Sequence, residues 1–335
     1  MVNIHYFVGK CEEKKEPPCN FTPLSKEEYE NMQESNTQLK KMQYNLIKDA
    51  IGDELQDNKL DIANNEIRIN NSWGGRAFIK EDTFKKLLTT LKKINFPLKG
   101  LIIESEVIPK EVCDFPLLET LDFGNGGEKI PECIGNLTNL KHLYIGRTSE
   151  NVPISFANLK QLETFNFGNA TAVEKFIANP NIEFKNLKQI SVDDATDNNN
   201  INADSFFKNL SRIAPTIEYV DLTYFRDYSI PPTISLLKNL KDINIEASNV
   251  KRFPLIFNTM PQLESIRIGG SSISSLKGIN KTTLKKVLVG TAHRGDLPAL
   301  SSRCENAFED LSADYVIFKK FNEEKIDDFM YDCTS

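Results

Sequence analysis

The sequence predicts an α/β solenoid, in which similar units stack side by side and each adds one strand to a parallel sheet. Two observations predict it. A short phrase recurs nine times between Leu98 and Ala292 at near-regular intervals, and apolar residues occupy positions one, four and six of every copy. Recurrence of this kind is typical of stacked repeats, which bury a continuous core between neighbours.

The phrase itself reads as a strand with one buried face. Side chains of a strand alternate between its two faces, so positions four and six point toward the core and positions three and five away from it. All eighteen residues at positions four and six are apolar, although only 40% of the chain is hydrophobic. The predicted inward residues are Leu101, Ile103, Leu121, Phe123, Leu143, Ile145, Phe165, Phe167, Ile190, Val192, Val220, Leu222, Ile243, Ile245, Ile266, Ile268, Val287 and Val289.

Residues 1–97 are predicted to form an N-terminal cap, mostly helical, because a solenoid needs a polar-faced unit at each end. A helix is expected to begin at Ser25, since Ser25 and Glu28 form a capping box. Its apolar residues keep mostly to one face: Tyr29, Met32, Leu39, Met42, Leu46, Ala50 and Ile51. Strand-like alternation is seen at Val2, Ile4, Tyr6 and Val8 and at Ile67, Arg68 and Ile69, and a second helix carries Phe84, Leu87, Leu88, Leu91 and Ile94 at helical spacing.

Residues 293–335 are predicted to form the C-terminal cap. The expected elements are a helix from Ser301 to Leu311, a strand from Tyr315 to Phe318 and an acidic helix from about Asn322 to Tyr331. This acidic tail resembles the translocation signals of effectors that intracellular bacteria inject through type IV secretion systems. An acidic helix that only solubilises the end of the chain is the alternative.

The second half of each unit refines the fold. An apolar residue and a proline recur as Ile108-Pro109, Ile130-Pro131, Val152-Pro153, Ile230-Pro231 and Phe253-Pro254, each followed at fixed spacing by two more apolar positions. Together with the strand phrase, this pattern resembles the leucine-rich repeat (LRR) of the I-P-x-x-Φ-x-x-L-x-x-L type, found in plant-type and many bacterial proteins. The resemblance covers residues 98–292 and implies a horseshoe-shaped arc with a parallel sheet on its concave side.

Two departures from the LRR pattern affect the turns. The family usually has asparagine just after the strand, where the side chains form a ladder. That position holds Glu106, Gly126, Thr148, Ala170, Ala195, Phe225, Ser248, Ser271 and Ala292, so the ladder is predicted to be absent or shifted to Asn125 and Asn169. The longest step contains a polar insertion followed by a predicted helix with Phe206, Phe207, Leu210 and Ile213 inward.

Function is predicted on the outward positions of the strands, which would form the concave surface. Tyrosine and arginine are favoured as binding anchors, which singles out Tyr144, Tyr219 and Arg267. An ordinary solvated polar face is the alternative for any single residue. The full set of candidate protein-binding residues is Asp122, His142, Tyr144, Asn166, Asp193, Tyr219, Asp221, Asp242, Asn244, Glu246 and Arg267.

Metal, cofactor and catalytic motifs are weak or missing. The insertion is rich in Asp and Asn, but an EF-hand loop starting at Asp193 has the wrong residue at Ala195, Asn198 and Asp204. The three histidines lie in separate segments, and neither a zinc-protease nor a phosphate-loop motif occurs. We therefore expect no metal, no cofactor and no enzyme, with a cysteine enzyme using Cys304 or Cys333 as a remote alternative.

Composition limits the partner and the setting. The net charge of −6 is made of interspersed signs, and no apolar run reaches membrane-spanning length, so neither a nucleic acid nor a membrane span is expected. No signal peptide is recognised at the N-terminus. The six cysteines (Cys11, Cys19, Cys113, Cys133, Cys304 and Cys333) look too scattered for a disulfide framework, which favours free thiols and a reducing, cytoplasmic setting. A bond between Cys11 and Cys19 is the exception left open.

The sequence thus predicts a monomeric, non-enzymatic module that binds a protein partner through the concave face. A bacterial effector acting in host cytoplasm is the predicted setting. The alternative is an adaptor for a ubiquitin or phosphatase system, with residues 1–97 as its docking part.

Overall fold

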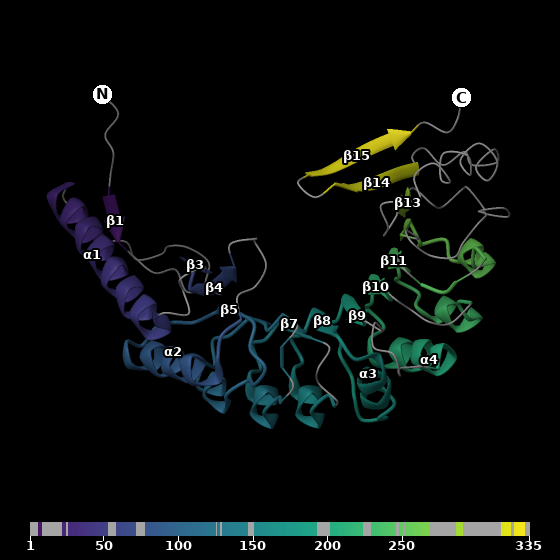
Figure 1. Cartoon of the computed structure of the whole chain (residues 1–335), viewed down its shortest axis with the longest axis horizontal. Coiled ribbons are helices and arrows are strands. Elements are labelled where there is room, and N and C mark those ends of the chain that lie inside the picture. Colours follow the sequence, from purple (N-terminus) through teal and green to yellow (C-terminus); the bar gives the residue numbers. More distant parts are fainter. Residues whose placement is uncertain are drawn as a thin grey trace.

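The chain forms an open arc. Its structure is a computed structural model that describes residues 6–8, 22–24, 26–52, 58–71, 78–124, 126–127, 129–146, 151–192, 202–223, 229–245, 248–250, 252–267, 286–290, 316–322 and 325–331. Strands line the inner side of the arc and helices lie on its outer side (Figure 1). One sheet of thirteen strands runs through the arc in the order β15 to β3.

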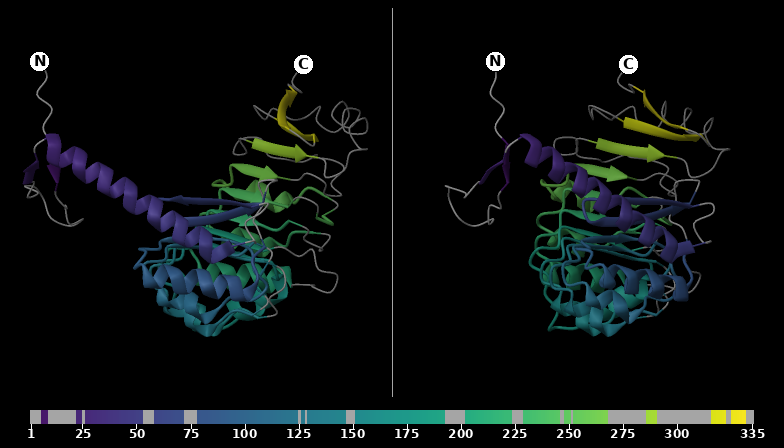
Figure 2. Two further views of the ribbon diagram at one scale, coloured as in Figure 1. Left: turned by 60° about the vertical axis from the view of Figure 1, so that its left-hand side comes forward. Right: turned by 90° about the vertical axis from the view of Figure 1, so that its left-hand side faces the viewer.

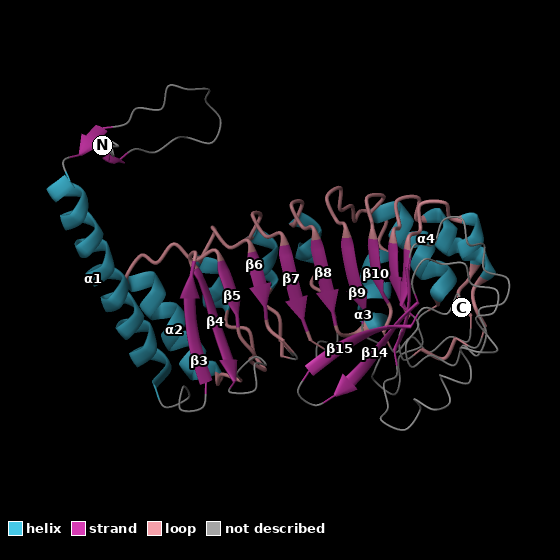
Figure 3. Ribbon diagram, turned by 90° about the horizontal axis from the view of Figure 1, so that it is seen from above, coloured by secondary structure: helices cyan, strands magenta, loops and turns pink. Residues whose placement is uncertain are grey.

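The nine predicted repeat strands are all present and parallel, each paired with the next. They are β5 (Gly100–Ile102), β6 (Thr120–Asp122), β7 (His142–Ile145), β8 (Thr164–Phe167), β9 (Gln189–Val192), β10 (Tyr219–Asp221), β11 (Asp242–Asn244), β12 (Ser265–Arg267) and β13 (Lys286–Gly290). Every pair aligns position three of one phrase with position three of the next. Viewed onto the sheet, the strands lie side by side (Figure 3). The predicted LRR arc is therefore confirmed.

The predicted inward residues form the core. From Leu101 to Ile266 each is at most 2% exposed, whereas the side chains of Ile268, Val287 and Val289 lie outside the described part. Aromatic rings from both layers of the arc meet inside it: the Phe165 ring centroid lies 5.8 Å from that of Phe167 and 6.4 Å from that of Phe156. The period-two pattern of the strands thus decides which face is buried.

The convex side is built from short 3₁₀ helices wherever the proline motif occurs. They are η2 (Lys110–Asp114), η3 (Glu132–Asn136), η4 (Ile154–Asn158), η5 (Pro232–Leu236) and η6 (Leu255–Thr259), each directly after the proline of its repeat. The proline fixes an extended backbone just before the turn. Its carbonyl accepts the hydrogen bond that closes the turn, as in Val112 N–H to Pro109 O at 3.1 Å.

Two repeats without this proline carry α-helices instead. The predicted helix after the insertion is confirmed as α4 (Ala203–Ile213), with Phe206, Phe207, Leu210 and Ile213 buried. Helix α3 (Ala170–Ile177) was not predicted. Asn169 was a sequence signal for the start of this helix, because asparagine is a favoured N-cap. Its Oδ1 accepts the Ala172 N–H at 3.0 Å.

The N-terminal segment adds strands as well as helices to the arc. Strands β3 (Asn58–Ala63) and β4 (Glu66–Asn71) form a hairpin, and β4 pairs in parallel with β5. The hairpin turn is Asn64 and Asn65, both at positive φ, which is the backbone of a type I′ turn. Helix α2 (Glu81–Lys93) buries the predicted residues Phe84, Leu87, Leu88 and Leu91. The strand predicted at Ile67–Ile69 is confirmed, and the division of the chain into cap, repeats and cap stays a prediction.

Helix α1 (Lys26–Ile51) departs from expectation in how it packs. It follows the short pair β1 (Tyr6–Val8) and β2 (Thr22–Leu24) and projects away from the arc (Figure 2). Among the side chains of α1 that the structure describes, the buried ones are Ile47, Ala50 and Ile51, in its last turns. Leu39, Met42 and Leu46 of the predicted apolar face are 48%, 55% and 39% exposed, so this part of the face is not covered by the described residues. Ser25, the predicted cap, lies outside the described residues.

The C-terminal segment corrects a second prediction. Strand β14 (Val316–Asn322) pairs in parallel with β13, and β15 (Lys325–Tyr331) pairs antiparallel with β14. The acidic helix predicted over this stretch is thus a strand. The register explains it, because Lys319 lies opposite Asp328 and Phe318 opposite Phe329, and such cross-strand pairs stabilise a hairpin. The helix predicted from Ser301 to Leu311 lies outside the described residues.

The missing asparagine ladder has a steric explanation at one turn. A Cβ on Gly126 would lie 2.0 Å from the carbonyl oxygen of Ser105, so the backbones of adjacent repeats already touch there. The Gly127 N–H donates to that same oxygen at 2.9 Å. Asn169 caps a helix rather than continuing a ladder, and Asn125 lies outside the described residues. Backbone contact therefore replaces a side-chain ladder at this position.

A different ladder, of charges, runs along the rim where the strands begin. Position two of the nine phrases alternates strictly between lysine and glutamate: Lys99, Glu119, Lys141, Glu163, Lys188, Glu218, Lys241, Glu264 and Lys285. Glu119 bridges both neighbours, with its Oε1 2.9 Å from Lys99 Nζ and its Oε2 2.7 Å from Lys141 Nζ. Two further pairs are Glu163–Lys188 at 3.0 Å and Glu218–Lys241 at 2.9 Å. This charge ladder joins successive repeats through opposite charges.

The charge ladder predicts a pH-dependent contribution to stability. Hydrogen bonds from Lys141 and Lys99 lower the pKa of Glu119 from 4.5 to about 2. Because the folded pKa is the lower one, the contribution is complete above about pH 4.5 and is lost as pH falls toward 2. Glu119→Gln is expected to destabilise the chain by about 1 kcal/mol at pH 7, since partly exposed ion pairs are screened.

Denaturant unfolding at pH 7 and at pH 2 measures this effect. Glu106→Gln is the matched control, because Glu106 is exposed and lies outside the charge ladder. An equal loss for Glu119→Gln at both pH values would count against the ionic origin.

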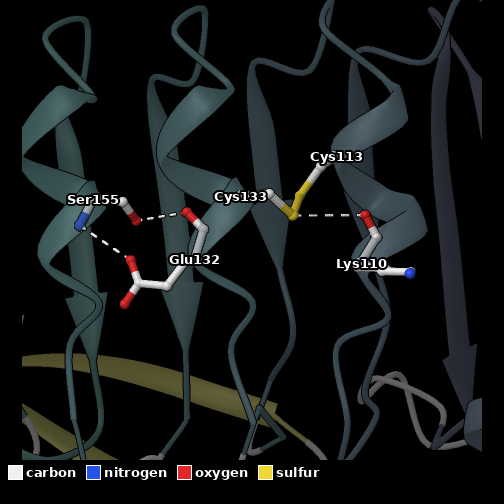
Figure 4. The surroundings of a disulfide bond; sticks show 5 residues. All are labelled: Lys110, Cys113, Glu132, Cys133 and Ser155. Atoms are coloured by element: carbon white, nitrogen blue, oxygen red, sulfur yellow. Dashed lines mark hydrogen bonds between the residues drawn. A yellow bond between two sulfur atoms is a disulfide. The ribbon is translucent and has the colours of Figure 1, made fainter.

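A disulfide joins two neighbouring 3₁₀ helices on the convex side. Cys113 of η2 and Cys133 of η3 are bonded (Figure 4), so the prediction of free thiols is wrong for these two residues. Cys113 stands four residues after its proline and Cys133 two after its own, which brings them together in stacked repeats. At the next junction Gly135 and Ser155 hold the same two places, and a Cβ on Gly135 would lie 2.3 Å from Ser155 O. The close approach is thus bridged covalently between η2 and η3, and is accommodated by a glycine between η3 and η4.

Candidate functional site: the concave face

The candidate residues lie in two rows across the concave face. The register aligns Asp122, Tyr144, Asn166, Ser191, Asp221, Asn244 and Arg267 in the first row, and Thr120, His142, Thr164, Gln189, Tyr219, Asp242 and Ser265 in the second. All nine described candidates fall in these rows, as their spacing predicts. Asp193 and Glu246 lie outside the described residues. We call the surface formed by the two rows the concave face.

Hydrogen bonds also occur in the first half of the concave face. The Gly124 N–H donates to Asp122 Oδ1 at 3.0 Å, which turns the chain at the end of β6. One strand on, His142 Nδ1 lies 3.2 Å from Thr164 Oγ1. His142 is exposed, whereas Tyr144 and Asn166 are half-buried. These side chains stand on adjacent strands and face the inside of the arc.

The second half holds a compact hydrogen-bonded cluster around Asp221. Its Oδ1 accepts the Thr223 Oγ1 hydroxyl at 2.6 Å and the Thr223 N–H at 3.0 Å, and its Oδ2 accepts the Tyr219 hydroxyl at 3.2 Å. Asn244 Nδ2 donates to Thr223 Oγ1 at 3.1 Å, and Asn244 is only 5% exposed. Asp221 therefore organises its neighbours and has little capacity left for a partner.

Tyr219 and Arg267 form the surface of this cluster. Burial, and then the negative charge of Asp221, raise the pKa of Tyr219 to about 12, so the phenol stays neutral at physiological pH. Arg267 Cζ lies 5.9 Å from the centre of the Tyr219 ring, a separation at which a cation–π contact forms. Arg267 reaches Tyr219 from two strands away, since β11 lies between β10 and β12. The Arg267 guanidinium thus lies across β11, near the Tyr219 ring.

One residue of this cluster was missed as a candidate. Thr223 follows the strand and links Asp221 to Asn244. A signal for it was present, because an Asp followed two residues later by Thr is a common local hydrogen-bonding turn. Conversely, Ile102 occupies an outward position but is only 6% exposed. The first repeat strand therefore contributes little to the polar surface.

Metal binding and membrane insertion are the other functions to consider for the described residues. Within the described ranges no group of three histidine, cysteine or acidic residues could hold a metal ion. No described helix is long and apolar enough to cross a membrane. What the concave face offers is hydrogen bonds, aromatic surface and one guanidinium.

The chain resembles LRR proteins of known structure at low sequence identity. No family model and no curated protein matches it. An internalin from Listeria monocytogenes is 16% identical, with 64% of this chain and 60% of that chain covered and a TM-score of 0.43. An LRR protein from Leptospira interrogans is 15% identical (75% and 63% covered, TM-score 0.41), and the plant peptide hormone receptor RGFR1 in complex with RGF2 is 17% identical (57% and 28%, TM-score 0.28). The chain spans about three fifths of the length of the first two.

Proposed function

We propose that the chain binds a protein or peptide partner along the concave face. The observation that supports this most is the continuity of the two rows, which run without a shift from β6 to β12. The described helices lie on the convex side or at the N-terminal end (Figure 1). The rows therefore present polar and aromatic side chains to the open side of the arc.

The size and composition of the face suit a protein partner. Seven strands about 4.8 Å apart span about 30 Å, comparable to one side of a standard interface. Tyr144, Tyr219 and Arg267 belong to the residue types that most often anchor such interfaces. Anchors at both ends of the rows favour an extended contact over a single small pocket.

Substitutions across the face test this proposal. The variant combines Tyr144→Ala, Asn166→Arg and Asp242→Arg, which change three half-buried residues outside the Asp221 cluster. The matched control combines Gln161→Arg, Glu183→Arg and Leu255→Ala, all exposed and outside the two rows. We expect affinity capture to retain the same partner with the wild type and the control and to lose it with the face variant. Equal capture by all three proteins would reject the concave face.

The adaptor alternative has one observation in its favour. Leu39, Met42 and Leu46 form an exposed apolar stripe on α1, at helical spacing and away from the arc. If this stripe docks a second protein, changing all three to glutamine should abolish capture of that protein while the concave-face variant still retains it. Retention by the stripe variant would remove this alternative.

The cellular setting stays a prediction. The expectation of a cytoplasmic protein depended on free thiols, and the Cys113–Cys133 bond removes that support. The resemblance of the tail to a secretion signal depends on its clustered acidic residues, whereas the alternative, a solubilising acidic helix, does not agree with strand β15 over residues 325–331. The binding proposal depends on neither feature.

A further inference from the structure

The charges on the concave face are unevenly distributed. Among the described outward residues from β6 to β12, the acidic ones are Asp122, Asp221 and Asp242, and the permanent cation is Arg267 at the far end. Two of the three carboxylates accept hydrogen bonds from their own turns, from Gly124 and from Thr223. Among the described side chains from β6 to β12, the face therefore becomes positive only at Arg267.

Without a partner, the Arg267 guanidinium already lies beside the Tyr219 ring. A long side chain loses conformational freedom when it binds, and that loss weakens the complex unless the side chain is already held. The Tyr219 ring supports the guanidinium at 5.9 Å, and the ring is itself fixed by its hydroxyl bond to Asp221. The Asp221 cluster thus acts as a platform for Arg267.

The contact with Tyr219 involves no hydrogen-bond acceptor, so it does not use the N–H donors of the guanidinium. The guanidinium carries five N–H donors in a planar fork. Among the described residues, Arg267 contacts the ring of Tyr219 and forms no salt bridge. A planar fork of donors of this kind matches a carboxylate, which can accept two parallel hydrogen bonds.

We infer that Arg267 is the anchor for an acidic side chain of the partner, and that this contact sets the direction in which the partner segment crosses the sheet. The inference rests on the proposed function of the concave face. The acidic residue of the segment lies at β12, and its remaining length extends over Asp242 and Asn166 toward Tyr144. Tyr219 is a positioning residue, because it acts through Arg267.

Random peptides displayed on phage and selected on the full chain provide the probe. We expect binders to be enriched in aspartate or glutamate at one position. The best acidic peptide, made synthetically, should bind Arg267→Gln about tenfold or more weakly than wild type, as expected for the loss of a charge-assisted hydrogen bond. Arg252→Gln, which removes an exposed arginine outside the two rows, should bind like wild type.

Two conservative changes separate the contact from a structural effect. Replacing the acid of the peptide by its amide should weaken binding to wild type but cause no further loss with Arg267→Gln. Tyr219→Phe keeps the ring but loses the hydroxyl bond to Asp221, so it should weaken binding less than Tyr219→Leu, which removes the ring as well. Thermal unfolding of each variant verifies that it is folded.

Other outcomes overturn the inference in distinguishable ways. Binders that lack acidic enrichment, or that bind Arg267→Gln like wild type, reject the acidic anchor. If those binders still lose affinity for Asn166→Arg, the concave face remains the binding surface. If Asn166→Arg has no effect on them either, the proposed function is contradicted together with the anchor.

Discussion

Replacing Cys113 and Cys133 together with serine is expected to lower the free energy of unfolding by about 3 kcal/mol. The bond closes a loop with a sequence separation of 20 residues, and a cross-link of that length restricts the unfolded chain by about this amount. It also joins two neighbouring repeats on the convex side, so its loss weakens one junction of the stack. Denaturant unfolding under oxidising conditions measures the difference.

Reduction of the wild-type protein is the matched control. Adding a thiol reductant should shift the wild-type midpoint toward that of the double serine variant and leave the variant itself unchanged. A wild-type midpoint that does not respond to reductant would show that the bond does not stabilise the fold.

The second large effect is expected from Phe165→Ala, which should cost about 3–5 kcal/mol. Phe165 is 1% exposed and its ring contacts Phe156 from the convex layer and Phe167 from its own strand. Removing it leaves a cavity between both layers in the middle of the arc, where the neighbouring repeats have little freedom to collapse. Denaturant unfolding gives the size of the loss.

Ile154→Ala in the adjacent repeat is the comparison. Ile154 is 56% exposed on the convex side. Its truncation should therefore change stability by about 0.5 kcal/mol at most, as is usual for surface substitutions. Similar losses for the two variants would mean that the interior of the arc is not packed around Phe165.

The repeat fold is predictable because its pattern is local and repeated. Alternation along the strand places residues such as Leu143 and Ile190 inward. One such phrase could also belong to a helix, but nine copies with the same pattern exclude that interpretation. The C-terminal tail has no such support. Its Asp327 and Asp328 suggest a charged helix face, whereas the strand depends on backbone pairing with β14, a register that the local sequence does not reveal.

Geometry between repeats is where prediction from the sequence fails. Cys113 and Cys133 are 20 residues apart in the sequence and gave no sign of a bond. Their proximity becomes visible only when each cysteine is numbered from the proline of its own repeat. The candidate residues were placed on the right face by spacing alone. Spacing could not show that Asp221 is already hydrogen-bonded by its neighbours, nor that the Arg267 side chain reaches across β11 to Tyr219.

Because lysine and glutamate alternate at the start of the strands, the charge ladder depends on the number of repeats between any two of its members. Deleting or duplicating one unit would place two like charges on adjacent strands, for example Lys99 beside Lys141 if the unit of Glu119 were lost. Units gained or lost in pairs keep every neighbour opposite in sign. Loss of a single repeat would therefore replace attraction by repulsion at one junction of the rim, whereas loss of two neighbouring repeats would not.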